Sequence, residues 1–141
     1  MNLTSNHRFF ARYLKKNIMA SYDDELRIFL VTCLKQIDYF QHKKISEDNL
    51  TLIAMYMIAM TEDRGNLLLD VKDAHSRDKT ESMIIIYSGT LAITTEIDGI
   101  ECVIDYITKG TIINAHNFLC ARPITCSIKC LTAITYYYLP V

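Results

Sequence analysis

The sequence predicts an α+β fold, with helices in the first part of the chain and a small antiparallel roll or barrel of strands in the second. All four glycines come after residue 64, so the first part lacks the main turn residue and the second is punctuated by it. Apolar residues before Gly65 recur at helical spacing, whereas those after it form short β-branched runs between turn signals. This order is typical of helices followed by a separate antiparallel sheet.

Length and composition favour one globular domain. The 141 residues suffice for one domain with its own core, and 50% hydrophobic against 22% charged residues exclude a disordered chain. The net charge of −1 gives no overall attraction to nucleic acid, so we expect no DNA partner. The five cysteines are an odd number, and the chain starts without a signal-like apolar region. We therefore expect free, mostly buried thiols in a reducing intracellular compartment.

Three helices are expected before Gly65. The first covers residues 7–19 and has an apolar stripe opposite four basic residues, with no acid among them. The second covers residues 26–37, preceded by a serine cap and three acids that suit a helix start. The third begins at Ser46 and runs through Ile58. The methionines at its end are expected to fill the core; they are Met55, Met57 and Met60.

Short strands are expected after Gly65, separated by glycine turns. Ser88-Gly89 and Asp98-Gly99 are the clearest turn signals, and the second is typical of a tight hairpin. Residues 72–81 are polar and charged, which predicts an exposed loop. The tyrosines 136–138 are interpreted as part of a half-buried strand rather than a stacking platform. The predicted strands cover residues 66–70, 83–87, 91–97, 101–107, 112–113, 127–131 and 134–139.

The sequence has no catalytic or metal-binding signature. Glycine-rich phosphate loops, nucleophile elbows and CxxC pairs are all missing from it. The four histidines have no i,i+4 partner, and Cys126 and Cys130 lack a second pair of metal ligands. We therefore predict no enzyme activity, no catalytic residues, no metal site and no cofactor.

The order of these elements over residues 34–139 resembles the cyclic nucleotide-binding domain family. Its most readable match is Met83-Ile-Ile-Ile-Tyr-Ser-Gly89-Thr-Leu, which is similar to the family's strand–Ser-Gly–strand hairpin. Lys109-Gly110 matches the glycine that opens the family's phosphate-binding cassette. Weaker matches are Leu34-x-x-Ile37-x-Tyr39-Phe40, Leu50-x-x-Ile53-Ala54-x-x-Met57 and Gly65-Asn-Leu-Leu-Leu. The resemblance implies N-terminal helices followed by an antiparallel β-roll, or jelly roll, of this type.

The resemblance also implies a cassette that has lost its polar anchors. In the family a glutamate binds the ribose and an arginine pairs with the cyclic phosphate. Residues 123–127, Pro-Ile-Thr-Cys-Ser, align with the family's Pro-Arg-Ala-Ala-Thr, which puts Ile124 at the arginine position and Ala115 at the glutamate position. Loss of a bidentate arginine–phosphate pair weakens binding by roughly two to four orders of magnitude. Ser127 and the loop backbone remain, and Arg122 is a candidate substitute for the lost arginine.

Two parts of the chain are distinguished on this basis. Residues 1–33 form a helical lead-in whose placement resembles the linkers of channel proteins, and residues 34–141 form the domain. The family's C-terminal lid helix is not expected, because the last predicted strand is followed by Pro140 and Val141. Interface candidates lie in the basic lead-in segment; they are Arg8, Phe9, Phe10, Arg12, Tyr13, Lys15 and Lys16. A solvated helix face is the plainer interpretation of the same segment.

The leading hypothesis is a non-enzymatic regulatory or protein–protein interaction module with a degenerate cassette. It would belong to a larger channel, exchanger or multisubunit complex and would not bind cAMP or cGMP at physiological levels. Its partners would be proteins, with a membrane contacted only through them, for example at its cytoplasmic face. The alternative is a sensor that binds a cyclic nucleotide or another small molecule through a non-standard cassette. The residues of such a pocket would be Asn114, Ala115, His116, Arg122, Ile124, Thr125 and Ser127.

Overall fold

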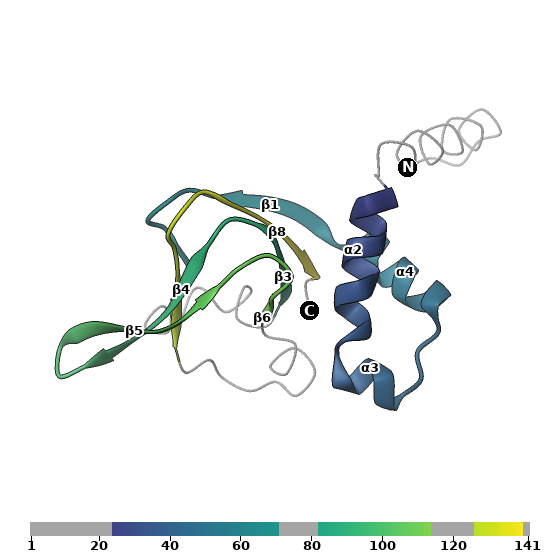
Figure 1. Cartoon of the computed structure of the whole chain (residues 1–141), viewed down its shortest axis with the longest axis horizontal. Helices are drawn as coiled ribbons and strands as arrows, with labels where there is room; N and C mark the ends of the chain where they lie inside the picture. Colours follow the sequence, from purple (N-terminus) through teal and green to yellow (C-terminus); the bar gives the residue numbers. More distant parts are fainter. Residues whose placement is uncertain (1–23, 71–81, 114–125, 140–141) are drawn as a thin grey trace, which may run out of the picture.

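The computed structural model describes residues 24–70, 82–113 and 126–139, and these form a group of helices beside a roll of strands (Figure 1). The helices are α2 (Asp24–Lys35), α3 (Asp38–His42) and α4 (Glu47–Tyr56). The strands are β1 (Ile58–Glu62), β2 (Leu67–Leu69), β3 (Met83–Ser88), β4 (Leu91–Ile97), β5 (Ile100–Ile107), β6 (Ile112–Ile113), β7 (Ser127–Cys130) and β8 (Ile134–Leu139). The predicted order of helices followed by an antiparallel β-roll is confirmed.

The strands form two four-stranded antiparallel sheets within the part of the chain that the structure describes. One sheet has the order β1-β8-β3-β6 and the other the order β2-β7-β4-β5. The last strand, β8, therefore lies between β1 and β3, which are far from it in the sequence. The β4–β5 hairpin turns at Asp98 and Gly99, which both have positive φ angles of 53° and 78°. This is the geometry that an Asp-Gly hairpin favours.

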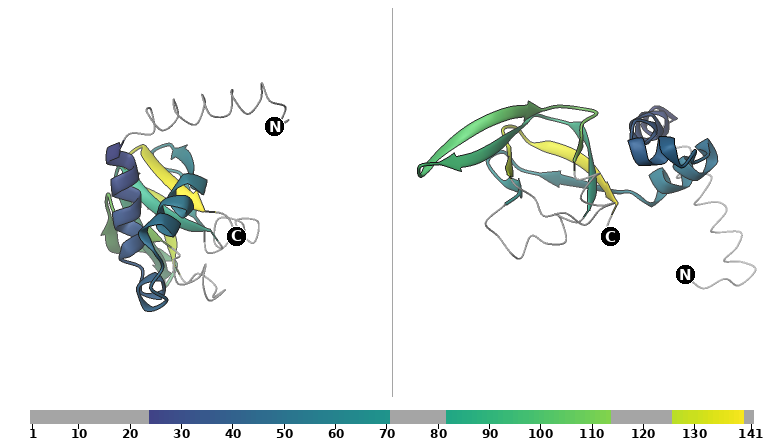
Figure 2. Two further views of the ribbon diagram at one scale, coloured as in Figure 1. Left: turned by 90° about the vertical axis from the view of Figure 1, so that its right-hand side faces the viewer. Right: turned by 90° about the horizontal axis from the view of Figure 1, so that it is seen from below.

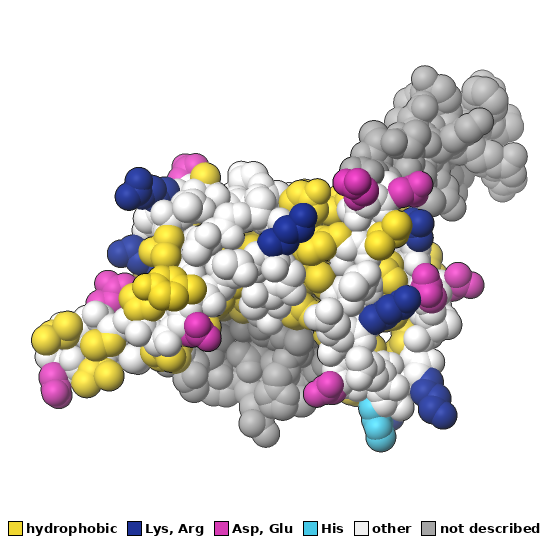
Figure 3. Space-filling model, viewed as in Figure 1, with side chains coloured by type: hydrophobic (Ala, Val, Ile, Leu, Met, Phe, Trp, Pro, Cys, Tyr) yellow, Lys and Arg dark blue, Asp and Glu magenta, His cyan; other side chains and the backbone are white. Residues whose placement is uncertain are grey.

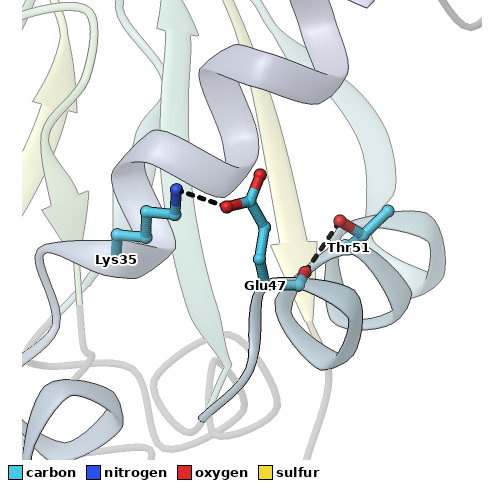
Figure 4. Close-up of polar contacts among 3 residues, drawn as sticks. All are labelled: Lys35, Glu47 and Thr51. Atoms are coloured by element: carbon cyan, nitrogen blue, oxygen red, sulfur yellow. Dashed lines mark hydrogen bonds and ion pairs between the residues drawn. The ribbon is translucent and has the colours of Figure 1, made fainter. Parts of the chain in front are cut away.

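The helices share one hydrophobic core, and a cap and an ion pair define how α4 begins beside α2. The Ser46 side chain accepts a hydrogen bond from the backbone N–H of Asn49 and so caps α4. Lys35 at the end of α2 donates to Glu47 at the start of α4 over 2.9 Å, and the Thr51 hydroxyl donates to the Glu47 carbonyl (Figure 4). The hydrogen bond from Lys35 and its positive charge lower the pKa of Glu47. Because both partners are exposed, this pair orients the helices more than it stabilises them.

Strand β3 connects two hydrophobic cores. Met83 and Ile85 pack against the helices, whereas Ile84 and Ile86 face the second sheet. This explains the uninterrupted burial along the strand, because each of its faces is covered by a different layer. Tyr136 on the neighbouring β8 is part of the second core, and burial raises the pKa of its hydroxyl to about 12.

Two predictions for the first half were wrong. The third helix ends at Tyr56 rather than Ile58, and residues 58–62 form β1, a strand that was not predicted. The cause is non-local, because β1 pairs with β8 in the register Ile58↔Tyr138, and this pairing overrides the helical spacing. Met57 is buried as expected, but Met55 and Met60 are about 40% exposed and do not fill the core.

The remaining element predictions agree within a residue or two, except that α3 was not predicted. The predicted helix over residues 7–19 and the loop over 72–81 lie outside the described residues. The proposed division between residues 33 and 34 stays a prediction. In the ranges that the structure describes, no helix is both long and apolar enough to span a bilayer.

Gly89 is the glycine whose replacement we expect to cost most. Its φ is +97°, and a Cβ there would lie 2.6 Å from the Ala133 carbonyl oxygen and 2.6 Å from Ile134 Cγ2. Gly99 also has positive φ, but its Cβ would meet open space. We expect Gly89→Ala to lower the free energy of unfolding by about 3 kcal/mol and Gly99→Ala by about 1 kcal/mol. Urea unfolding of both variants checks this, and equal losses would contradict the packing argument.

Candidate functional site

Most residues predicted for a ligand pocket lie outside the described part of the chain. These are Asn114, Ala115, His116, Arg122, Ile124 and Thr125. The interface candidates of the lead-in lie outside it as well; they are Arg8, Phe9, Phe10, Arg12, Tyr13, Lys15 and Lys16. Ser127 is described, as the first residue of β7. The structure therefore shows Ser127 and the two borders of the cassette, which are Ile113 and Cys126.

Ser127 lies on the face of its sheet that points away from the second core. It pairs with Thr94 of β4, and Lys129 pairs with Ala92. The alternate residues of β7, Ile128 and Cys130, belong to the core between the sheets. Because successive residues of a strand point to opposite faces, Ser127 and Lys129 lie on the outer face.

A hollow of about 370 Å³ lies beside Ser127. It contains three carboxylates, one ammonium group and three hydroxyls, so it offers hydrogen bonds and a negative balance of charge. It is lined by Gly65, Leu67, Asp70, Thr94, Thr95, Glu96, Glu101, Ser127 and Lys129. Sequence reasoning missed this hollow, because its walls come from four strands whose order in the sheet is not sequential.

The hollow offers groups for hydrogen bonding and for charge pairing. Its lining residues include neither histidine nor cysteine. Among the described residues, no group of three or more histidine, cysteine, aspartate or glutamate side chains is placed to hold a metal ion.

The turn before β6 is clamped onto helix α2 and β3. The Gly110 backbone N–H donates to the Ile86 carbonyl over 2.8 Å. The Lys109 ammonium group lies 5.1 Å from the ring centroid of Phe29 on α2 and 4.9 Å from that of Tyr87 on β3. Two rings around one cation give a cation–π contact between a helix and the sheet. Since β6 ends at Ile113, this clamp fixes the chain just before the cassette segment.

Cys33 on α2 faces the same turn. Its Sγ lies 3.9 Å from the Gly110 carbonyl oxygen, to which the thiol donates. Burial raises the pKa of the Cys33 thiol, and the positive charge of Lys109 opposes this rise only in part. Of the four cysteines in the described ranges, Cys33 and Cys130 are buried, while Cys102 and Cys126 are partly accessible. All four are free thiols, as the sequence predicted. Only two of the four are buried, so the prediction of mostly buried thiols is correct for half of them.

Comparisons with protein-family models and with curated proteins find no match. Solved structures do match. The regulatory domain of a Toxoplasma gondii protein kinase A with cAMP is 22% identical, with a TM-score of 0.68, over 84% of this chain and 42% of that one. The regulatory subunit of a cAMP-independent protein kinase A from Trypanosoma brucei is 15% identical, with a TM-score of 0.61, over 82% and 40%.

Two further matches bear on ligands. A triple mutant of the Trypanosoma brucei subunit, in which one change introduces an arginine, has cAMP bound in its A site and matches this chain equally well. The regulatory subunit of a cAMP-independent protein kinase A from Trypanosoma cruzi is bound to guanosine. It is 16% identical, with a TM-score of 0.65, over 84% of this chain and 38% of that one.

These likenesses establish the fold. The chain has the β-roll and preceding helices of a cyclic nucleotide-binding domain, as the sequence resemblance predicted. It spans about two fifths of the length of the kinase regulatory chains that it matches.

The Lys109 clamp is tested by Lys109→Met. Removal of the cation should lower the free energy of unfolding by about 1 kcal/mol, because two ring contacts are lost while the apolar stem is kept. Lys109→Arg retains the cation over both rings and should lie close to wild type. Chemical denaturation of the three proteins is the measurement. Equal stability of the methionine and arginine variants would show that the cation contributes nothing.

The burial of Cys33 predicts slow alkylation. A raised pKa leaves little thiolate near neutral pH, so iodoacetamide should modify Cys33 at least about tenfold more slowly than the partly accessible Cys102. Peptide-resolved mass spectrometry of the folded protein measures both rates. The urea-unfolded chain is the control, in which the two rates should converge. Equal rates in the folded protein would contradict the assignment of Cys33 as buried and Cys102 as partly accessible.

Proposed function

We propose that this chain is a non-enzymatic regulatory or protein–protein interaction module, and that it does not bind cAMP or cGMP at physiological concentrations. The observation that carries the proposal is the pair Ile124 and Ala115 in a cassette of otherwise normal length. An anionic phosphate beside Ile124 would be partly desolvated without a counter-charge, which is unfavourable. The loss of the bidentate arginine alone accounts for roughly two to four orders of magnitude in affinity.

The match to the Trypanosoma brucei subunit supports the proposal, because it shows this fold in a kinase that is cAMP-independent. The Trypanosoma brucei protein is a regulatory subunit of a kinase that is cAMP-independent, and its cAMP-bound mutant has gained an arginine. The arginine is one of three changes in the mutant that is bound to cAMP. This chain has Ile124 where the family has its phosphate-binding arginine. We therefore favour a module that acts through proteins.

The described surfaces support partners rather than substrates. The hollow beside Ser127 offers hydroxyl, carboxylate and ammonium groups that can bind a partner. The matched regulatory subunits are longer chains, which fits a domain that works within a larger channel, exchanger or multisubunit complex. Contact with a membrane would come only through such a parent or partner protein.

A small-molecule sensor is the second candidate. It is favoured by the Trypanosoma cruzi subunit, which is bound to guanosine, a nucleoside without a phosphate. A pocket without the phosphate arginine suits such a neutral ligand better than a cyclic nucleotide. Arg122 and Ser127 would then supply its polar contacts.

Calorimetric and thermal-shift titrations separate these functions. The wild-type protein should show no saturable binding of cAMP, cGMP or guanosine up to millimolar concentrations. Binding at one hundred times Kd would stabilise the protein by about 2.7 kcal/mol, so a specific ligand would be visible. A saturable shift with cAMP or cGMP would overturn the proposal, and one with guanosine alone would favour the second candidate.

Restoring the two anchors should create cyclic nucleotide binding. The double variant Ala115→Glu with Ile124→Arg should bind cAMP or cGMP about two orders of magnitude or more tighter than the wild type. Ala115→Glu with Ile124→Lys is the matched control, because lysine supplies the charge without the bidentate geometry. Calorimetry measures both. A folded arginine variant that still binds neither nucleotide would show that the missing anchors are not what excludes them.

A further inference from the structure

The outer side of the β4–β5 hairpin is both apolar and acidic. Val103, Ile104 and Tyr106 are 51%, 57% and 62% exposed. Glu96 and Glu101 lie directly opposite each other on the two strands. We call these five residues the hairpin surface. It adjoins the hollow beside Ser127, which Glu96 and Glu101 help to line.

The strand register places Val103 and Tyr106 on one side of the hairpin. Tyr106 pairs with Ala92 and Val103 with Thr94, on the face opposite the second core. The register shift between Ile93 and Thr94 leaves Ile104 as an extra residue beside Val103, and its side chain is exposed as well. β5 is the terminal strand of its sheet in the described structure, and the hairpin projects from the roll (Figures 1 and 3).

All the charged residues of this hairpin are acidic. Between Thr90 and Thr108 there are four acids and no lysine, arginine or histidine. The direct pairing of Glu96 with Glu101 is destabilising in itself, because like charges repel across a pair of strands. The adjoining hollow is lined by one basic residue, Lys129, and by three acidic residues, Asp70, Glu96 and Glu101. The surface therefore fits an apolar partner with an excess of positive charge.

Residues 7–19 of this chain have the complementary composition. They carry four basic residues and no acid, and they contain aromatic residues together with an apolar stripe at helical spacing. The first 22 residues contain no aspartate or glutamate at all. The segment thus matches the hairpin surface in the sign of its charge and in its apolar side chains.

The placement of the two ends favours a contact between two copies. Helix α2, to which this segment is joined, lies at the opposite end of the molecule from the projecting hairpin (Figures 1 and 2). The six residue steps from Ile18 to Asp24 span at most about 20 Å when the chain is fully extended. To reach its own hairpin surface the segment would have to cross the roll. In two antiparallel copies, however, the start of α2 in one copy comes to the same end of the assembly as the hairpin of the other copy.

We propose that residues 7–19 of one copy dock on the hairpin surface of a second copy, and that the exchange is reciprocal in a closed two-fold dimer. The inference rests on the proposed function as an interaction module and names its partner. The apolar stripe would cover Val103, Ile104 and Tyr106, while the basic residues approach Glu96 and Glu101. In a closed two-fold dimer both segments are docked and both hairpin surfaces are covered. If each copy instead docked on a different neighbour, the copies would assemble into filaments.

A charge-exchange experiment with the full chain tests the proposal. The hairpin variant carries Glu96→Lys and Glu101→Lys, and the segment variant carries Arg8→Glu, Arg12→Glu, Lys15→Glu and Lys16→Glu, which make the segment acidic. Sedimentation velocity at micromolar concentrations should show a wild-type dimer that weakens at high ionic strength. Each variant alone should dissociate at least about tenfold more readily, because segment and hairpin then carry the same sign. The equimolar mixture of the two should regain the dimer, since both contacts become complementary again.

The controls separate this outcome from misfolding and from other occupants. Circular dichroism and the melting temperature of each variant report folding, and Asp63→Lys reverses an exposed acid outside the hairpin. A monomeric wild-type protein, a segment variant that dimerises like wild type, or a mixture that stays monomeric would each overturn the proposal. None of these results depends on cyclic nucleotide binding, so they leave the titrations above to decide the proposed function separately.

Discussion

The structure depends on one strand that must be buried on both faces. β3 presents Met83 and Ile85 to the helices and Ile84 and Ile86 to the second sheet. Neither layer could be removed without exposing one side of this strand to water, so the helices and the roll stabilise each other through it. The same strand carries Tyr87, which holds Lys109 against α2 and thereby fixes the turn before the cassette.

The local part of the fold could be predicted, and the non-local part could not. The strands after Gly65 were found because glycine turns separate them and β-branched residues fill them. β1 was missed because its apolar residues also fit the end of a helix, and its partner β8 lies far along the chain. For the site, the role of Ser127 in a cassette pocket stays a prediction, and the hollow that Ser127 lines was not foreseen. Its walls depend on the order of strands within the sheet, which periodicity does not reveal.

Two parts of this domain differ in chemistry. The cassette sequence has Ile124 where the family has its phosphate-binding arginine, which is the basis of the proposal that cyclic nucleotides are excluded. The hairpin surface has exposed apolar side chains beside the carboxylates of Glu96 and Glu101. Exposed groups of this kind are maintained at a cost in solubility and stability unless they bind something. The two proposals, exclusion of cyclic nucleotides and docking on the hairpin surface, therefore rest on different parts of the chain.

The position of β8 also has a consequence for how the chain folds. β8 lies between β1 and β3 and provides a hydrogen-bonding partner for both, yet it is the last strand of the described residues. During synthesis, β1 and one edge of β3 therefore stay unpaired until residues 134–139 have left the ribosome. Long-range pairing of this kind slows folding and prolongs the exposure of apolar strands such as β3. The first sheet is thus completed only after the second sheet's β4–β5 hairpin has been synthesised.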